Sequence, residues 1–354
     1  MITIDGSYME GGGQIIRTAL AFSALTRKPF RAVNIRHNRP VPGLKRQHLS
    51  CIDALQQLTG AKVEGGALKS SRIEFVPGRL VPKTLAIDIG TAGSITLLLQ
   101  SLMLPLMFAG SRIDLMLTGG TDTRWSIPID YFKHIIVPYA NAFAGIDSHV
   151  IRRGFFPKGQ GRVDITVRPG YHIDDFDTMG HFLRYLRSKV APIMLLEKEQ
   201  PVCIKGVASA SGSLKKAEVS KRMISGATNR LNGLWPVDIM EQYSPSASSG
   251  AIITLWAVGS RGGVSMGADC LGQRGKRAEI VGETAATKLF ELLNSDAAVD
   301  CHLADNLIPL LALARGRMKT NQITGHIRSN CYVCEQFIDV AFDIDEQNGI
   351  IRVV

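Results

Sequence analysis

The sequence lacks the signals that direct a chain to or across a membrane. It has no basic segment followed by an apolar stretch at its start, so we expect no signal peptide. Residues 89–111 carry no charge, but only Ile95–Phe108 is strongly apolar, and Gln100, Ser101 and Pro105 interrupt it. That run is too short to cross about 30 Å of hydrocarbon. We therefore expect a buried core helix here, no membrane partner and a cytoplasmic location.

The sequence also lacks the usual cysteine spacing of a disulfide framework or of a structural zinc site. The six cysteines show no secreted spacing, so we expect free thiols. Cys331 and Cys334 could be combined with His326, Cys301 or His302 in a zinc site. A structural zinc site needs four ligands, usually from two short-spaced pairs, and the adjacent Cys301 and His302 would hardly chelate one ion together. The pattern favours core cysteines.

The common nucleotide-binding motifs are missing as well. The chain has no G-x-x-x-x-G-K-[ST] and no G-x-G-x-x-G after a strand. Residues 272–276 have the wrong spacing for a P-loop, with Arg277 where Ser or Thr is required. The Lys-x-Asp-Gly motif of lysine-adenylylating ligases is absent too, because the nearest string, Thr3–Gly6, has no lysine. These absences argue against a P-loop nucleotide-binding protein, a Rossmann dinucleotide-binding protein and a lysine-adenylylating ligase.

The chain does have an excess of positive charge and of glycine. The net charge is +10 and the pI about 9.4, which favours phosphate-bearing partners, although a soluble basic protein without such a partner is the alternative. Apolar residues make up 45% of the chain, a globular composition. The glycines gather at expected turns, at 11–13, 90 and 93, 119–120, and 159 and 161. There the backbone can approach an anion beside a helix N-terminus.

Hydrophobic periodicity predicts a repeated unit of strands and two helices. The first copy has expected strands at Met1–Asp5, Phe30–Ile35, Ala61–Glu64 and Arg72–Pro77, and helices at Gln14–Leu25 and Arg46–Leu58. The second has strands at Leu85–Ile89, Arg112–Thr118, Val150–Arg153 and Arg162–Arg168, and helices at Ser94–Phe108 and Tyr131–Phe143. The third has helices at Glu283–Leu293 and Asn330–Phe337, a second apolar segment at His302–Ala314, and strands at Gln322–Ile327, Ala341–Ile344 and Ile350–Val354.

The repetition breaks between the second and third copies. Small polar runs flank an expected basic helix at Leu214–Leu231 and an expected strand at Gly250–Val258. We therefore predict an α/β (α+β) fold with a large domain of repeats, residues 1–173 and 274–354, and a smaller inserted α/β domain, residues 174–273.

A basic loop runs from Arg36 to His48 and contains Arg36, His37, Arg39, Lys45, Arg46 and His48. Pro40, Pro42 and Gly43 prevent a helix and stiffen the loop. A stiff loop that presents Arg side chains suits phosphate recognition, and a solvated basic loop is the alternative.

Six motifs occur in order along nearly the whole chain, and together they resemble those of the RNA 3′-terminal phosphate cyclases. They are Glu10–Arg17, Arg39–Gly43 with Arg46–His48, Gly90–Gly93 through Gln100, Gly119–Asp122 through Pro128, His302–Asp305, and Gly325–His326 with Asn330. The resemblance implies three βαβαββ-type units and an inserted small domain, in agreement with the repeat.

The resemblance also implies a reaction in three steps, with ATP as AMP donor and Mg²⁺ or Mn²⁺ as cofactor. His326 matches the family's nucleophile and would take AMP from ATP. The AMP would pass to the 3′-terminal phosphate of an RNA, and the neighbouring 2′-hydroxyl would then displace AMP to leave a 2′,3′-cyclic phosphate. Glu10 is the matching carboxylate for the metal. The sequence leaves the oligomeric state open.

Other roles are implied position by position. The family's adenylate pocket matches Gln100, Pro128, His302, Leu303, Ala304, Asp305 and Asn306. Positions that hold phosphates of the nucleotide or of the RNA end match Arg17, Arg36, Arg39, Gln47 and His48. The chain departs from the family's usual pattern at Asn306, at Ile127 and in the loop Thr123–Ser126.

Two alternatives remain at this point. A non-catalytic RNA-binding relative acting in ribosomal RNA processing would lack the nucleophile, and His326, Glu10 and Arg17 favour the cyclase instead. An enolpyruvyl transferase shares the repeat but needs six copies, and only three fit here.

Overall fold

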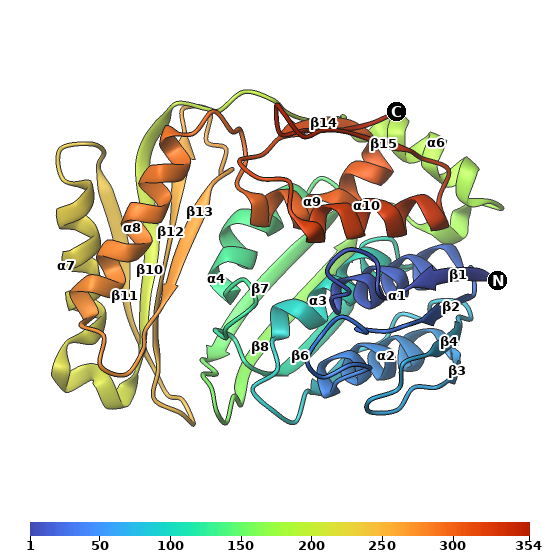
Figure 1. Cartoon of the computed structure of the whole chain (residues 1–354), viewed down its shortest axis with the longest axis horizontal. Helices are drawn as coiled ribbons and strands as arrows, with labels where there is room; N and C mark the ends of the chain where they lie inside the picture. The colour runs from blue at the N-terminus through green and yellow to red at the C-terminus, as the bar shows by residue number, and fades with distance from the viewer.

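The large body of the protein contains three four-stranded sheets of one topology (Figure 1). The computed structural model describes the whole chain, residues 1–354. The strands of these sheets are β1 (Ile2–Asp5), β2 (Phe30–Val33), β3 (Lys62–Glu64), β4 (Ile73–Val76), β5 (Leu85–Asp88), β6 (Ile113–Gly119), β7 (Ala144–Arg152), β8 (Gly161–Pro169), β9 (Ile193–Leu195), β14 (Gly316–Lys319), β15 (Phe342–Asp345) and β16 (Ile350–Val353).

The strand orders are β1-β2-β4-β3, β5-β6-β8-β7 and β9-β14-β16-β15. In each sheet the first two strands are parallel and the other pairs are antiparallel. The mixed α/β class and the repeated unit predicted from the sequence are therefore confirmed.

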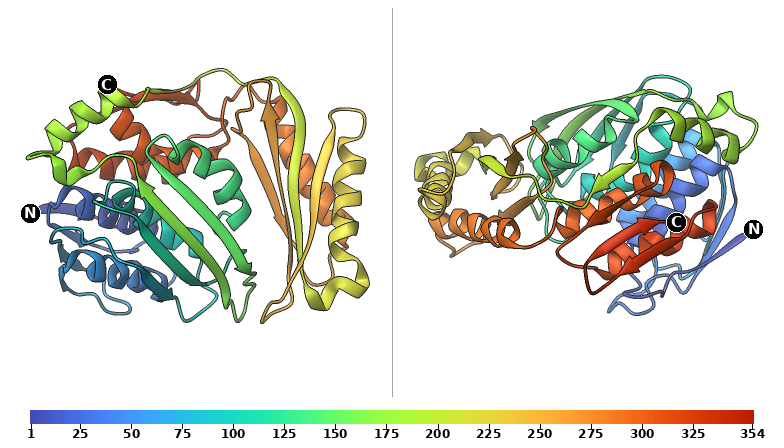
Figure 2. Two further views of the ribbon diagram at one scale, coloured as in Figure 1. Left: turned by 180° about the vertical axis from the view of Figure 1, so that it is seen from behind. Right: turned by 90° about the horizontal axis from the view of Figure 1, so that it is seen from above.

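The helices of the three units meet in the middle of the large body, and the sheets lie around them (Figures 1 and 2). Helix α1 contacts α3 and α10, and α10 contacts α9. One hydrophobic cluster of 76 buried residues joins all three units, so no unit buries its apolar face alone. The helices of the large body are α1 (Gln14–Thr26), α2 (Arg46–Thr59), α3 (Ile95–Leu106), α4 (Ile129–Tyr131), α5 (Val137–Ala140), α6 (Met179–Lys189), α9 (Cys301–Ala314) and α10 (Gly325–Phe337).

Most predicted elements of the first two units are present, with one helix changed. The helix expected at Tyr131–Phe143 is divided into α4, a π-helical turn η1 (Phe132–Ile136) and α5. Pro138 lacks an N–H, so a regular helix could not continue unbroken through it. The helix expected at Ser94–Phe108 is α3, which is buried along most of its length and caps its first turn with the Ser94 hydroxyl. None of the helices combines the length and apolar character that a membrane crossing needs.

The third unit differs from the prediction in its first two strands. Its first strand is β9, which pairs in parallel with β14 although more than a hundred residues separate them. The strand predicted at Gln322–Ile327 was wrong. Helix α10 already begins at Gly325, because the Thr324 hydroxyl accepts the Ile327 N–H as an N-cap.

The inserted unit contains a fourth four-stranded sheet and has its own core. Its strands, in the order β11-β10-β12-β13, are covered by two helices that contact each other extensively. Twenty buried residues form its separate hydrophobic cluster. The elements are β10 (Pro201–Ser211), the 3-10 turn η3 (Gly212–Ala217), α7 (Val219–Leu231), β11 (Val237–Ser244), β12 (Ala251–Gly259), β13 (Gly267–Leu271) and α8 (Ala278–Asn294).

The two clusters divide the chain at different residues from the predicted boundaries of 174 and 273. Phe182, Leu183 and Leu186 of α6 belong to the large cluster, and β9 belongs to a sheet of the large body. Helix α8, expected in the third unit, belongs to the smaller cluster instead. We therefore propose that the inserted unit starts after β9 and ends after α8.

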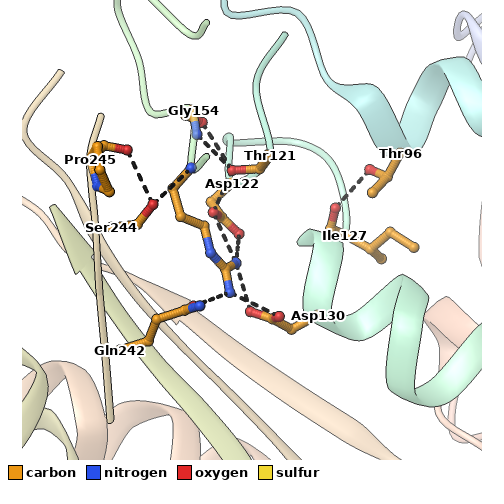
Figure 3. A network of polar contacts seen from close by, with 10 residues as sticks. Thr96, Thr121, Asp122, Ile127, Asp130, Gly154, Gln242, Ser244 and Pro245 are labelled. Atoms are coloured by element: carbon orange, nitrogen blue, oxygen red, sulfur yellow. Dashed lines mark hydrogen bonds and ion pairs between the residues drawn. The ribbon is translucent and has the colours of Figure 1, made fainter. Parts of the chain in front are cut away.

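A buried ion network joins the inserted unit to the large body (Figure 3). The Arg153 guanidinium, 1% exposed, forms ion pairs with Asp122 at 3.3 Å and Asp130 at 2.7 Å. It also donates to Gln242 of β11 at 2.8 Å, and the Arg153 N–H donates to the Ser244 hydroxyl at 3.2 Å. Burial raises the pKa of Asp122 to about 6, with Asp130 adding to the shift and Arg153 opposing it. One buried cation thus serves two carboxylates at the junction.

Candidate active site

His326 and Glu10 meet at one edge of the central helices. The Nε2 atom of His326 lies 3.5 Å from Glu10 Oε2, and both side chains are partly exposed. Arg39, from the basic loop, donates from Nη2 to the same Glu10 oxygen at 2.9 Å. A Cβ on Gly325 would lie 2.7 Å from Glu10 Oε1, so glycine leaves room for the carboxylate beside α10. The structure thus brings together three residues that are far apart in sequence.

His326 occupies the first turn of α10, immediately after the Thr324 N-cap and Gly325. The unpaired N–H groups and the positive end of the helix dipole lie at this turn. Such a helix N-terminus stabilises a bound anion. The position therefore suits a nucleophile that must attack a phosphate group.

Arg17 of α1 sets the orientation of two glutamines, the buried Gln14 and the half-buried Gln100. Its Nε donates to Gln100 Oε1 at 2.9 Å, and its Nη2 donates to Gln14 Oε1 at 2.6 Å. Guanidinium has no acceptor, so each amide must turn its oxygen toward Arg17 and its nitrogen away. Gln14 then donates to Asn330 Oδ1 at 3.1 Å, and Gln100 donates to Asn306 Oδ1 at 3.0 Å.

The chain of hydrogen bonds ends on Asp305. Asn330 accepts from Gln14 and from the Thr18 hydroxyl, so its amide nitrogen faces Asp305 and donates to the carboxylate at 2.6 Å. Burial raises the pKa of Asp305, whereas His326 and Arg17 lower it. Helices from all three units are therefore connected by one polar network.

His48 lies against the glycine run. Its Nδ1 accepts the Lys45 N–H at 2.9 Å at the start of α2. Its Nε2 would be 2.1 Å from a Cβ on Gly13, and Arg17 Nη1 would be 3.0 Å from the same atom, so Gly13 admits both side chains. Burial above all, and then the nearby Arg17, lowers the pKa of His48 to about 3. His48 is therefore a neutral imidazole near pH 7.

Two further predicted phosphate-site residues hold loops in place. The Gln47 amide donates to the Ser94 carbonyl at 2.9 Å, which joins α2 to the turn before α3. Arg36 is buried and donates from Nη1 to the carbonyls of Val41 and Gly43, so it braces its own loop. In this structure Arg36 thus acts on the loop that carries Arg39.

The residues expected around the adenylate fall into four places. Gln100, Asp305 and Asn306 line a cavity of about 70 Å³ between the central helices. His302 is exposed at the start of α9, one turn before Asn306, which donates to its carbonyl. Pro128 precedes α4, beside Ile127, whose carbonyl accepts from Thr96 of the cavity wall (Figure 3). Leu303 and Ala304 are buried in the main cluster, and their N–H groups donate to Asp300.

Three residues of the network were not among the predicted site residues: Gln14, Thr18 and Asn330. All three line the same cavity. Gln14 and Thr18 flank Arg17 on one face of α1, at the i, i+3, i+4 spacing. Polar side chains at that spacing on an otherwise apolar helix were the signal that could have identified them.

The fold and site define a class: a three-repeat α+β protein with a histidine, a carboxylate and arginines gathered where the repeats meet. The family model described as RNA 3′-terminal phosphate cyclase matches residues 8–344. The chain is 40% identical to the RNA 3′-terminal phosphate cyclase of Thermococcus onnurineus, covering 99% of this chain and 97% of that protein. It is 40% identical to the cyclase so named in Archaeoglobus fulgidus, covering 99% of this chain and all of that protein. The chain therefore belongs to the RNA 3′-terminal phosphate cyclase family.

Proposed function

We propose that the protein is an ATP-dependent ligase that converts an RNA 3′-terminal phosphate to a 2′,3′-cyclic phosphate through a covalent histidine–AMP intermediate. The observation that carries the proposal is the position of His326, with Nε2 3.5 Å from Glu10 and in the first turn of α10. We also propose that it works in the cytoplasm, since its six cysteines are free thiols.

In the first step, His326 Nε2 attacks the α-phosphorus of ATP. A nitrogen–phosphorus bond forms, the bond to the bridging oxygen breaks, and pyrophosphate leaves. Neutral imidazole is a competent nucleophile near pH 7. The N-terminus of α10 and the Arg39 guanidinium stabilise the negative charge that builds on the phosphate oxygens.

In the second step, an oxygen of the RNA 3′-phosphate attacks the phosphorus held by His326. The histidine is released and the RNA end carries AMP through a new phosphoanhydride. In the third step, the 2′-hydroxyl attacks the RNA phosphorus, its proton is lost, and AMP leaves with the bridging oxygen. We assign phosphate binding to Arg17, Arg39, Gln47 and His48, which lie along one path from Glu10 to the turn before α3.

The donor set fits a hard divalent ion held largely by the nucleotide. No group of three or more His, Cys, Asp or Glu side chains is placed to hold a metal ion, and Glu10 is a partly exposed carboxylate at the site. Mg²⁺ commonly uses one or two carboxylates together with substrate phosphates. Glu10 would thus hold Mg²⁺ or Mn²⁺, which would neutralise phosphate charge.

The test is covalent labelling. The protein is incubated with ATP labelled at the α-phosphate and with Mg²⁺, without RNA, and is then denatured. Label should stay on the protein, be lost in acid as expected of a phosphoramidate, and vanish in His326→Ala. The exposed His181→Ala, on α6, is the matched control and should label as the wild type does.

A second measurement addresses the substrate. An oligoribonucleotide with a 3′-phosphate should be cyclised after labelling, and the same oligonucleotide with a 3′-hydroxyl should not. Full labelling of His326→Ala, or a product from the hydroxyl end, would contradict the proposed reaction.

A further inference from the structure

Two aromatic side chains project almost entirely into solvent. Trp125 is 94% exposed and Phe156 is 75% exposed, and no other aromatic residue exceeds 40%. Leaving such large apolar surfaces in water forgoes the stabilisation that burial supplies, so their exposure calls for a reason. Neither side chain belongs to either hydrophobic cluster.

Both residues extend from one group of loops beyond the ends of β6 and β7. Asp122 and Phe155 form an isolated β-bridge, and the Thr121 N–H donates to the Gly154 carbonyl at 2.9 Å. The Trp125 backbone is held at φ +69°, a left-handed conformation that is unfavourable for a bulky residue. The Thr123 and Ser126 hydroxyls, 3.0 Å apart, close the turn beneath it.

These loops continue into the proposed phosphate site. The Gly120 N–H donates to the Gly93 carbonyl at 2.7 Å, and Gly120 pairs with Ser94. The Ser94 carbonyl accepts from Gln47, the neighbour of His48. A connected series of backbone and side-chain contacts thus leads from His48 to the loops that carry the aromatic pair.

The exposed charge on these loops is positive. Arg124 and Lys158 flank the aromatic pair, and Arg152 is exposed at the end of β7. The only acidic residue in the segments 119–126 and 152–160 is Asp122, which is buried and paired with Arg153. Exposed aromatic rings among cations, with no exposed carboxylate on the same loops, match the chemistry of a single-stranded nucleic acid.

We propose that Trp125 and Phe156 form a stacking platform for bases of single-stranded RNA on the 5′ side of the 3′-terminal phosphate. This inference rests on the proposed function, because the site must first accept an RNA end. Arg124 and Lys158 bind the backbone phosphates of the same nucleotides, and the rings stack on the bases. Every base has a π-face, so the platform tolerates any sequence and favours length over base identity.

The first experiment uses tryptophan fluorescence. Of the three tryptophans, Trp256 is 5% exposed and Trp235 is half-buried, so Trp125 is the one freely open to a base. A 3′-phosphorylated oligoribonucleotide of about six nucleotides should quench the emission of the full-length protein. The quench should disappear in Trp125→Ala and persist in Trp235→Phe.

The second experiment compares substrates of two lengths. In Trp125→Ala and in Phe156→Ala, the KM for the oligoribonucleotide should rise about 5- to 150-fold, the range for losing one stacked base, with kcat little changed. The KM for a nucleoside 3′-phosphate, which has no upstream base, should stay the same. Trp125→Tyr should restore most of the affinity for the oligonucleotide. Labelling by ATP without RNA serves as the folding control for each variant.

The outcomes separate this inference from the proposed chemistry. A wild type that does not label with ATP but is quenched through Trp125 contradicts the chemistry and supports the platform. Equal KM values for the oligonucleotide in wild type and both alanine variants would overturn the platform. An equal rise in the KM for the nucleoside 3′-phosphate would overturn it as well. Quenching of Trp125 by anionic phospholipid vesicles and not by RNA would also overturn it, and would assign the two aromatic residues to a membrane surface.

Discussion

Arg17 Nε donates to Gln100 Oε1 at 2.9 Å and so joins α1 of the first unit to α3 of the second. The same guanidinium orients Gln14, which reaches Asn330 of the third unit. One side chain thereby determines which atoms of two amides face the cavity. The geometry of the site depends on how the three units pack, and it is vulnerable to changes at Arg17.

Replacing Arg17 with lysine should slow covalent labelling by ATP about tenfold or more. Lysine is a point donor without the planar fork, so it cannot hold both Gln14 and Gln100 in this geometry, and a lost hydrogen bond to a charged group costs about 1.5–3 kcal/mol. Labelling rates measure the effect. Arg31→Lys is the matched change, at the half-buried pair with Glu74 that joins β2 to β4, and it should label normally. Equal rates for both variants would refute the role of the fork.

Gly13→Ala should impair the site through a single methyl group. The added Cβ would lie 2.1 Å from His48 Nε2, so the imidazole must move. Gly13 has φ −69°, which alanine adopts without strain, and overpacking of this kind costs about 1–3 kcal/mol. We expect labelling to fall about tenfold, measured beside Gly110→Ala, where an added Cβ meets nothing within 4 Å. A loss of similar size in Gly110→Ala would show that the method lacks specificity.

His48 should make folding stability depend on pH below neutrality. Its pKa is lowered to about 3, so below about pH 6.5 the unfolded chain binds a proton that the folded chain does not. The stability is thus fully present above pH 6.5 and declines on acidification, by about 2 kcal/mol at pH 5. Urea unfolding at pH 7 and pH 5 should show this extra loss in the wild type and not in His48→Gln. Parallel losses in the two proteins would argue against a neutral buried His48.

Removing Arg153 should cost far more stability than removing one of its partners. Arg153→Met leaves Asp122 and Asp130 buried without a cation, which costs about 3–5 kcal/mol. Asp122 has its pKa raised to about 6, so its contribution to stability is present at low pH and is lost as the pH rises through 6. Asp122→Asn removes the cost of burying an ionised Asp122 at pH 7, while Arg153 keeps Asp130 as its partner. The free energy of unfolding should therefore change by less than about 1 kcal/mol. Equilibrium unfolding compares the two variants, and equal losses would contradict the assignment.

The sequence alone determined the repeat, the class of fold and the order of the motifs. Periodicity and glycine turns are local patterns, so they predicted α1, α2 and α3 closely, and the resemblance singled out His326, Glu10 and Arg17. The i, i+3, i+4 spacing of Gln14, Arg17 and Thr18 on α1 was also present in the sequence, but the sequence did not show which residues these side chains contact.

Only the tertiary structure decided which distant segments complete the third unit and the site. β9 pairs with β14 across the whole inserted unit, and three residues in β9 are too few for a clear periodic signal. Gln14 and Asn330, 316 positions apart, share a hydrogen bond, and His48 has its low pKa because other segments bury it. Strand pairing, burial and amide orientation depend on contacts between remote parts of the chain, and a linear pattern carries no record of those contacts.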